Sequence, residues 1–113
     1  MCMSYSIGAN IVPRSCLDDL NKLLKLVNPI ARDMPWTYWR NIMQSGNQLI
    51  TCFDDKRNCV IGMTTVAPII IPSGCFADIY DTAVFAEYAD TPVTSSMLCA
   101  AEKLIKDANL ILI

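Results

Sequence analysis

Residues 77–113 of this chain, ADIYDTAVFAEYADTPVTSSMLCAAEKLIKDANLILI, predict a strand, a turn, a helix and a second strand in succession. The run 75–85 is apolar enough to predict a central strand that is covered on both faces. Apolar side chains at helical spacing predict a helix over residues 94–107, with Glu102 and Lys106 paired on its outer side. The final NLILI predicts a strand, and this order of elements usually forms a right-handed parallel crossover.

The turn between this strand and this helix, ADTPVT at residues 89–94, contains a proline and no glycine. Many folds hold the phosphates of a nucleotide cofactor at such a junction, usually with glycines that let the backbone approach the phosphate. Pro92 has no N–H group to donate, and neither Thr91 nor Pro92 has the conformational freedom of glycine. From the residues alone, the turn is a cofactor loop, a damaged cofactor loop or simply a turn.

Upstream of this segment, the pattern predicts a strand followed by two helices. Residues 4–12 alternate loosely, as in a strand, and Ser15 is predicted to cap a helix that continues to Val27. Pro35 precedes a second helix, WTYWRNIMQS, which Gly46 can end.

A hairpin then joins QLITCF, residues 48–53, to CVIGMTTVAPIII, residues 59–71, through the polar turn DDKRN. Pro68 lies within the second of these strands and predicts a bulge or an edge position there. The complete order is β-α-α-β-β-β-α-β in a single domain spanning residues 1–113. We therefore predict an α/β (α+β) fold with a mixed, mostly antiparallel sheet.

Composition and charge exclude several classes of protein. The chain has nine Lys and Arg against eleven Asp and Glu, and its basic residues are scattered, so no nucleic-acid partner is expected. No apolar run reaches the roughly 18 residues of a membrane-spanning helix, so no membrane partner is expected. The N-terminal MCMSYSIGAN lacks the basic start and apolar centre of a secretory signal, which predicts a cytoplasmic location.

Six cysteines and no histidine limit the chemistry that the chain can perform. The cysteines form no CxxC pair, and zinc sites usually contain such pairs or histidines, so no metal site is expected. A cytoplasmic location favours reduced, mostly buried thiols over disulfides. Without histidine, the usual Ser-His-Asp and Cys-His mechanisms are excluded.

The order of elements and the residues from position 58 onward resemble the GNAT superfamily of N-acetyltransferases. NCVIGMTTVAPIIIPSG, residues 58–74, is similar to the second and third strands of that family, with its Val-x-Gly motif at residues 60–62. Residues 77–113 are similar to its cofactor-binding segment, in which Glu87-Tyr88 precedes the loop. The resemblance implies a GNAT-like fold, acetyl-CoA as cofactor and transfer of an acetyl group to an amine.

The same resemblance implies cofactor-binding residues on the strand, in the loop and at the helix start. These are Thr82, Val84, Ala89, Asp90, Thr91, Thr94 and Ser95. Backbone groups at Thr82 and Val84 would contact the thioester, and the other residues would surround the pyrophosphate.

The loop of this chain departs from the family pattern at several positions. Glycines are missing, Ala89 stands in place of Arg or Gln, and Pro92 lacks a donor. Asp90 places a negative charge near the pyrophosphate, which at about 4–6 Å costs on the order of 1–4 kcal/mol. We therefore expect acetyl-CoA to bind weakly or not at all.

Two acidic residues are candidates for the general base that removes a proton from an attacking amine. Asp81 aligns with an acidic position of glucosamine-phosphate acetyltransferases, and Glu87 could act through a water molecule. The alternative for Asp81 is a hydrogen-bonded carboxylate at a strand bulge.

Members of the family continue past the last strand seen here with another helix and one or two strands. A sheet that ends at residues 109–113 has an exposed apolar edge, which predicts a homodimer or a protein partner at this strand. Three functions remain open: a non-catalytic binding or regulatory module, a minimal active N-acetyltransferase, or, outside the family, a βαββαβ small-molecule sensing domain. A parallel splay between the strands at 75–85 and 109–113 would reject the third.

Overall fold

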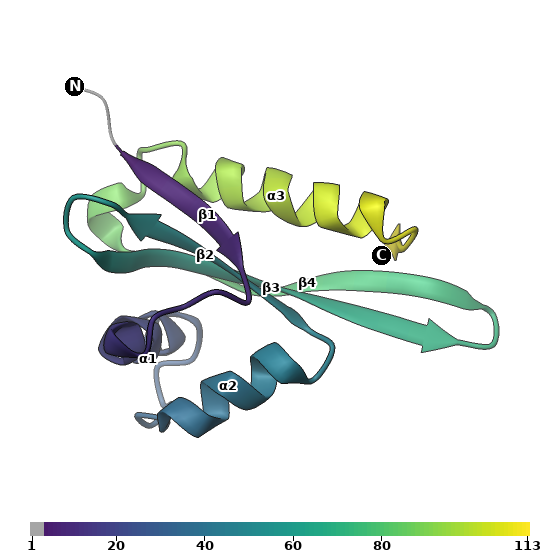
Figure 1. Ribbon diagram of the computed structural model, residues 1–113, viewed down its shortest axis with the longest axis horizontal. Helices are drawn as coiled ribbons and strands as arrows, with labels where there is room; N and C mark the ends of the chain where they lie inside the picture. Colours follow the sequence, from purple (N-terminus) through teal and green to yellow (C-terminus); the bar gives the residue numbers. More distant parts are fainter. Residues whose placement is uncertain (1–3) are drawn as a thin grey trace.

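The computed structural model describes residues 4–113 as a five-stranded sheet with helices on both faces (Figure 1). The strands follow one another across the sheet in chain order, from β1 to β5. The pairs β1–β2, β2–β3 and β3–β4 are antiparallel, and β5 is parallel to β4. Their bounds are β1 Tyr5–Ala9, β2 Gln48–Asp54, β3 Cys59–Ile71, β4 Gly74–Val84 and β5 Ile111–Leu112.

Within these residues the strands are connected by three α-helices and two short 3-10 helices. These are η1 Arg14–Cys16, α1 Leu17–Val27, α2 Trp36–Gln44, η2 Ala86–Tyr88 and α3 Val93–Asp107. Helix α3 crosses one face of the sheet, whereas α1 and α2 lie on the other (Figure 1). The predicted order of elements and the mixed, mostly antiparallel sheet are confirmed. None of the helices in residues 4–113 is long and apolar enough to cross a membrane.

Alternation along the strands divides the core into two layers, one on each face of the sheet. The layer under α3 consists of Ile50, Cys52, Ile61, Val66, Ala77, Tyr88, Val93, Met97, Ala101 and Ile105. The layer under α1 and α2 consists of Cys16, Leu20, Leu23, Trp39, Leu49, Val60, Met63 and Ala83. Gly62 lies under α3, where a Cβ atom would be 2.9 Å from Cε of Met97, so this glycine makes room for the helix.

The first strand and the first helix have other boundaries than the sequence predicts. β1 ends at Ala9 because Asn10 has a positive φ of 57° and bonds through its side chain to the start of β2. Ser15 is not a helix cap: it lies in η1, and α1 begins after Cys16 without a side-chain cap. The Cys16 N–H donates to the Pro13 carbonyl at 2.9 Å, which closes a tight turn before α1.

Strand β4 is more exposed than the sequence predicts. The predicted coverage on both faces holds only in part: Ala77 is buried under α3 and Ala83 under α1 and α2, but the other residues of the strand are half-buried or exposed. Strands β3 and β4 also extend past Gln48, the start of β2, as an arm in which β4 gains only a short pairing with β5 at Phe76 and Ala77 (Figure 1). Pro68 lies in this arm, past the last β2–β3 pair at Val66, which confirms its predicted edge position.

Candidate functional site

The candidate site lies where β4 ends and α3 begins. The end of β4 is fixed to β3 because the Phe85 N–H donates to the Ile61 carbonyl at 3.1 Å. The chain then forms η2 and a short turn at residues 89–92, and α3 begins at Val93. This is the strand-turn-helix junction that the sequence predicts, so the cofactor-loop hypothesis depends on which of its backbone groups face a ligand.

Most backbone donors of this loop are bonded within the loop itself. In Tyr88, Ala89 and Thr91 the N–H donates to the carbonyl three residues earlier, at 2.9 to 3.2 Å. Pro92 has no N–H group. Among residues 88–92, Asp90 therefore carries the one backbone N–H without a partner in the described part of the chain.

The first turn of α3 offers two more backbone donors. The Val93 N–H points to Oγ1 of Thr91 at 3.4 Å, and the Ser95 hydroxyl donates to the Pro92 carbonyl at 3.0 Å. The N–H groups of Thr94 and Ser95 have no intrahelical acceptor, because the first turn of an α-helix lacks preceding carbonyls. These two groups are the donors that an anion can reach at this end of the helix.

A buried hydrogen bond anchors the loop to the turn between β2 and β3. Tyr88 is 7% exposed, and its hydroxyl donates to Oδ2 of Asp54 at 2.8 Å. Oδ1 of Asp54 accepts the N–H groups of Lys56 and Arg57 at 2.9 and 3.2 Å. The Tyr88 hydroxyl, more than the other donors, holds the pKa of Asp54 below its ordinary value. Burial and this carboxylate raise the pKa of Tyr88 to about 12.

From the sequence, Asp54 is predicted to lie in the polar turn at residues 54–58, and its contact with Tyr88 is not predicted. Asp54 instead ends β2, and its carboxylate accepts the turn N–H groups that follow it. The available signal is an aspartate directly after an apolar strand, since aspartate often bonds to the backbone N–H two residues on.

Glu87, one of the two predicted general bases, is directed to the same turn. Its carboxylate pairs with the Arg57 guanidinium at 3.0 Å, and both side chains are more than half exposed. The guanidinium also lies 5.8 Å from the centre of the Tyr88 ring. No hydrogen bond or ion pair in residues 4–113 joins Glu87 to Asp81, so the two predicted catalytic residues do not form a bonded pair.

Asp81 and Thr82 form a β-bulge in β4. The register with β3 shifts between Met63 and Thr65, so these two residues share one partner position, that of Thr64. Asp81 has a positive φ of 54° and is exposed, and its carboxylate accepts no hydrogen bond from the described residues. The Thr82 hydroxyl lies 2.8 Å from that of Thr64, which is fully buried. The predicted bulge is therefore confirmed, whereas the hydrogen bond expected for its carboxylate is wrong.

One edge of β4 is open over the same stretch. β5 pairs with β4 at Phe76 and Ala77, and the Ile113 N–H donates to the Ala77 carbonyl at 2.9 Å. From residue 79 to Val84, β4 pairs with β3 alone among the described strands. Of the predicted cofactor-binding residues, Thr82, Ala89, Asp90 and Ser95 are exposed, and Val84, Thr91 and Thr94 are half-buried.

The cysteines of residues 4–113 are dispersed over the sheet and its helices. All five of them are free thiols, and no group of three or more His, Cys, Asp or Glu side chains there could hold a metal ion. Cys16 and Cys52 are buried, as predicted, but Cys75 and Cys99 are exposed on the outer sides of β4 and α3.

Solved structures of acetyltransferases match nearly the whole chain. An acetyltransferase of Trypanosoma brucei covers 97% of this chain and 81% of its own, with a TM-score of 0.77 and 11% identity. A GNAT family acetyltransferase of Staphylococcus aureus covers 97% and 84%, with a TM-score of 0.68 and 15% identity. This chain has the GNAT fold. A transcriptional regulator of Bacillus halodurans matches as well, covering 96% and 79% with a TM-score of 0.73 and 18% identity.

The GNAT fold is recognised here by structure and not by overall sequence similarity. No protein-family model matches the sequence, and a comparison with curated proteins finds no match either. The structural matches confirm the fold that the resemblance implies. The predicted parallel pairing of the last two strands is present in this chain as β4 with β5. Because the acetyltransferase match covers 97% of this chain, the GNAT fold accounts for all of the chain's elements and is favoured over the βαββαβ sensing domain.

Proposed function

We propose that this chain is a GNAT-fold binding module without acetyl-CoA-dependent catalysis. The observation that carries the proposal is the internal bonding of the loop after β4, where Tyr88, Ala89 and Thr91 donate to loop carbonyls. A pyrophosphate requires several backbone N–H groups that converge on it. To supply them, this loop would break three of its own hydrogen bonds and the turn that they close.

The side chains of the loop also oppose a pyrophosphate. Asp90 is exposed next to the start of α3, where its charge repels a phosphate by on the order of 1–4 kcal/mol at about 4–6 Å. The guanidinium of Arg57, which contacts Tyr88, is already paired with Glu87. The residues present therefore do not fit the pyrophosphate of acetyl-CoA. The start of α3 retains enough donors for weak contact with a single phosphate.

A binding role agrees with what the fold supports elsewhere. One of the matched structures is that of a transcriptional regulator, and a fold alone does not fix an activity. For this chain we propose a regulatory role that depends on contact with another protein chain, and not on turnover of a substrate.

A minimal active N-acetyltransferase is the second candidate, and the bulge in β4 favours it. Asp81 is held at a positive φ of 54°, and residues in such strained conformations gather at functional sites. Its exposed carboxylate lies beside the open edge of β4, where it could accept a proton from an amine. This candidate requires acetyl-CoA to bind despite the loop.

Calorimetric titration with acetyl-CoA and with CoA separates the two candidates. We expect no saturable heat with millimolar ligand, since neither the loop backbone nor its side chains suit the pyrophosphate. Saturable binding in the micromolar range would contradict the proposed module. Loss of acetylation of an amine panel in Asp81→Asn would then support the second candidate.

A variant designed to bind CoA more tightly gives the same hypothesis a positive result to test. The double variant Asp90→Gly/Pro92→Gly removes the opposing charge and gives the turn the freedom of glycine. We expect its affinity for CoA to rise at least about tenfold, because roughly 1.4 kcal/mol of relieved repulsion corresponds to that factor. Pro72→Gly, a matched change in the distant β3–β4 turn, should leave the affinity unchanged.

A further inference from the structure

Thr51, in β2, is a buried polar residue whose hydroxyl has no hydrogen-bond partner within residues 4–113. Its side chain is enclosed, with only 2% of the residue exposed. The other buried polar residues of this part of the chain, Asn21, Asp54 and Thr64, each bond to a side chain or a backbone group. Because a buried hydroxyl without a partner destabilises a protein, Thr51 requires an explanation.

The Thr51 side chain borders a cavity of about 300 Å³ at the β1 end of the sheet. Every side-chain nitrogen or oxygen atom that is completely enclosed within residues 4–113 has a hydrogen-bond partner. The hydroxyl of Thr51 has none, so it reaches open space, and the space that Thr51 borders is this cavity. An unpaired hydroxyl in the wall of a cavity is a group to which a bound molecule can bond.

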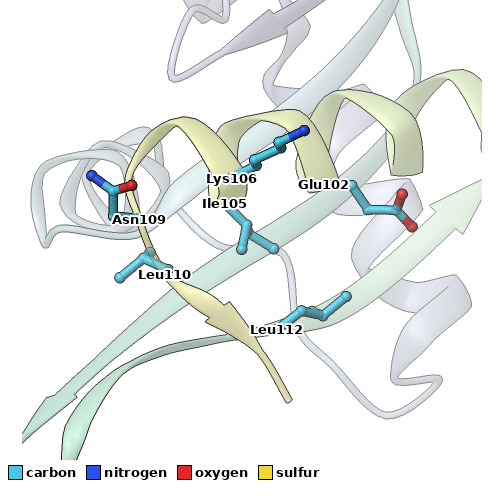
Figure 2. A pocket seen from close by; sticks show the side chains of 6 residues that line it. All are labelled: Glu102, Ile105, Lys106, Asn109, Leu110 and Leu112. Atoms are coloured by element: carbon cyan, nitrogen blue, oxygen red, sulfur yellow. The ribbon is translucent and has the colours of Figure 1, made fainter.

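A larger cavity, of about 520 Å³, lies beside α3 and β5 (Figure 2). The polar residues in its lining, Glu102, Lys106 and Asn109, are all exposed. Their polar groups have access to water, so none of them indicates a ligand. The buried hydroxyl of Thr51 distinguishes the smaller cavity from this one.

The smaller cavity exists because Gly8, the residue opposite Thr51, has no side chain. Gly8 and Thr51 are a cross-strand pair of β1 and β2, and Ser6 and Phe53 are the next pair on the same side. Cross-strand partners point to the same face of a sheet, and Phe53 packs with the layer under α1 and α2. The cavity therefore lies on that face, over the space that a side chain of Gly8 would fill.

The fold itself does not require a glycine at position 8. Gly8 is not among the glycines with a positive φ. A Cβ atom on Gly8 would lie 3.7 Å from Cβ of Ile11, which is an ordinary contact. A glycine inside a strand often marks a place where another molecule approaches closely.

One rim of the cavity, formed by residues 10–13, is fixed within the chain. Asn10 bonds through its side chain to two backbone groups around the start of β2, at 2.8 and 3.1 Å. The carbonyl of Pro13 accepts the N–H of Cys16 at 2.9 Å. Ile11 and Pro13 line the cavity between these anchors. The site is thus preformed, and a ligand has little chain to order when it binds.

The lining of the cavity suits a neutral and mainly apolar molecule. Its apolar walls are Phe53, Ile11 and Pro13, and no charged side chain of residues 4–113 lines it. The hydroxyl of Ser6, which also lines it, donates to Oδ1 of Asp55 at 3.1 Å. Phe53 favours an aromatic ring, because ring pairs gain from edge and offset contacts. A cavity of about 150 Å³ holds benzene, so this one has room for two fused rings.

We propose that this cavity binds a small neutral aromatic molecule that carries one hydroxyl group, with the size and chemistry of a naphthol. The rings contact Phe53, Ile11 and Pro13, and the ligand hydroxyl bonds to the hydroxyl of Thr51, which can donate or accept. Strands β2 and β3 separate β1 from β4. The site is therefore independent of the loop after β4 and of whether acetyl-CoA binds.

The test is an amide-resolved NMR titration of the unaltered chain with 2-naphthol. The amide signals of Gly8, Ile11 and Thr51 should shift saturably, with a dissociation constant on the order of 1 mM or below for a ligand of about eleven non-hydrogen atoms. The charged analogue 2-naphthalenesulfonate should leave these signals unchanged, because no cation of the described residues lines the cavity. Equal shifts with the sulfonate, or no saturable shift with 2-naphthol, would overturn the proposal.

The variant Thr51→Val separates a ligand-binding group from a structural one. Its hydroxyl has no partner within residues 4–113, so the free energy of unfolding should stay the same or rise, whereas the affinity for 2-naphthol should fall about fivefold. Thr64→Val is the matched control, because it removes a hydroxyl that bonds to Thr82 at 2.8 Å outside the cavity. The control should lose stability and keep its affinity. A less stable Thr51→Val protein with unchanged affinity would overturn the proposal.

Filling the cavity at Gly8 is the second arm. Gly8→Ala places one carbon atom there, and Gly8→Val places three. The affinity for 2-naphthol should fall in that order, whereas Gly8→Ala should be at least as stable as the unaltered chain, because glycine weakens a strand. Circular dichroism checks that each variant is folded. Unchanged affinity in a folded Gly8→Val protein would overturn the proposal and leave the cavity to water.

Discussion

Two consecutive segments of the chain use their backbone groups in opposite ways. In the loop at residues 85–92, the N–H groups of Tyr88, Ala89 and Thr91 bond to loop carbonyls, and Tyr88 is fastened to Asp54. In the preceding stretch of β4, from residue 79 to Val84, one edge is unpaired among the described strands. Most N–H groups of the loop are therefore bonded within the loop, whereas one edge of the strand has no partner strand among the described residues.

This contrast locates the groups that remain available for binding. A cofactor loop has to present donors, and the loop of this chain consumes most of its own in three short turns. The sheet, by contrast, leaves hydrogen-bonding groups and apolar side chains exposed at β4 and β5. The proposed binding role therefore predicts that partners contact the open edge of β4 and not the loop.

The largest expected effect comes from removing the anchor of the loop. Asp54→Ala leaves the buried Tyr88 hydroxyl and two turn N–H groups without their acceptor. We expect a loss of about 3 kcal/mol in the free energy of unfolding, measured with urea. Tyr88→Phe removes a single bond and should lose less; an equal loss in both variants would contradict the shared acceptor.

The next effect tests the bulge in the open strand. Asp81→Val places a β-branched side chain at a positive φ of 54° and should destabilise the protein by roughly 2 kcal/mol. Asp81→Gly suits that conformation and should change the free energy of unfolding by less than about 0.5 kcal/mol. Similar stability of the two variants in thermal unfolding would show that the backbone conformation does not govern this position.

A smaller effect concerns the hydroxyl pair beneath the bulge. Thr82→Val leaves the buried Thr64 hydroxyl without a partner, at an expected cost of about 1 kcal/mol. The double variant Thr64→Val/Thr82→Val removes both hydroxyls and should recover most of that loss. A double-mutant cycle of chemical unfolding measures the coupling, and additive losses would contradict a hydrogen bond between the two.

The smallest effect is a pH dependence at the closed loop. The Tyr88 hydroxyl lowers the pKa of Asp54 in the folded chain, so folding favours the ionised carboxylate. This contribution is fully present above the unfolded pKa of about 3.9 and is lost as the pH falls through the lower folded value. Stability curves of the unaltered chain and Asp54→Asn should therefore converge as the pH falls below about 4. If the stability curves of the two proteins stay parallel below about pH 4, the pKa of Asp54 is not lowered by folding.

Local pattern is sufficient to predict most elements of the fold. Two apolar runs joined by a polar turn, residues 48–53 and 59–71, predict the hairpin, and helical spacing after Pro92 predicts α3, both confirmed. The ends of β1 and α1 were missed because a positive φ at Asn10 and a tight turn at Pro13 fix them.

The bonding of the site could not be predicted because it joins distant residues. Tyr88 and Asp54 are 34 positions apart, and no period relates them. The position of Glu87 beside the loop predicts a base, yet its carboxylate pairs with Arg57, 30 positions earlier in the chain. The opposite error occurs at Glu102 and Lys106, where helical spacing predicts an ion pair that the structure lacks.

An amide-resolved NMR titration with CoA tests the central contrast most directly. The amide signals of Ala89, Asp90 and Thr91 report on the loop, and those of Thr94 and Ser95 report on the start of α3. We predict that the loop amides of Ala89 and Thr91 stay unchanged up to millimolar CoA, because their N–H groups remain bonded to loop carbonyls. Saturable shifts of these loop amides, at micromolar CoA, would contradict a closed loop.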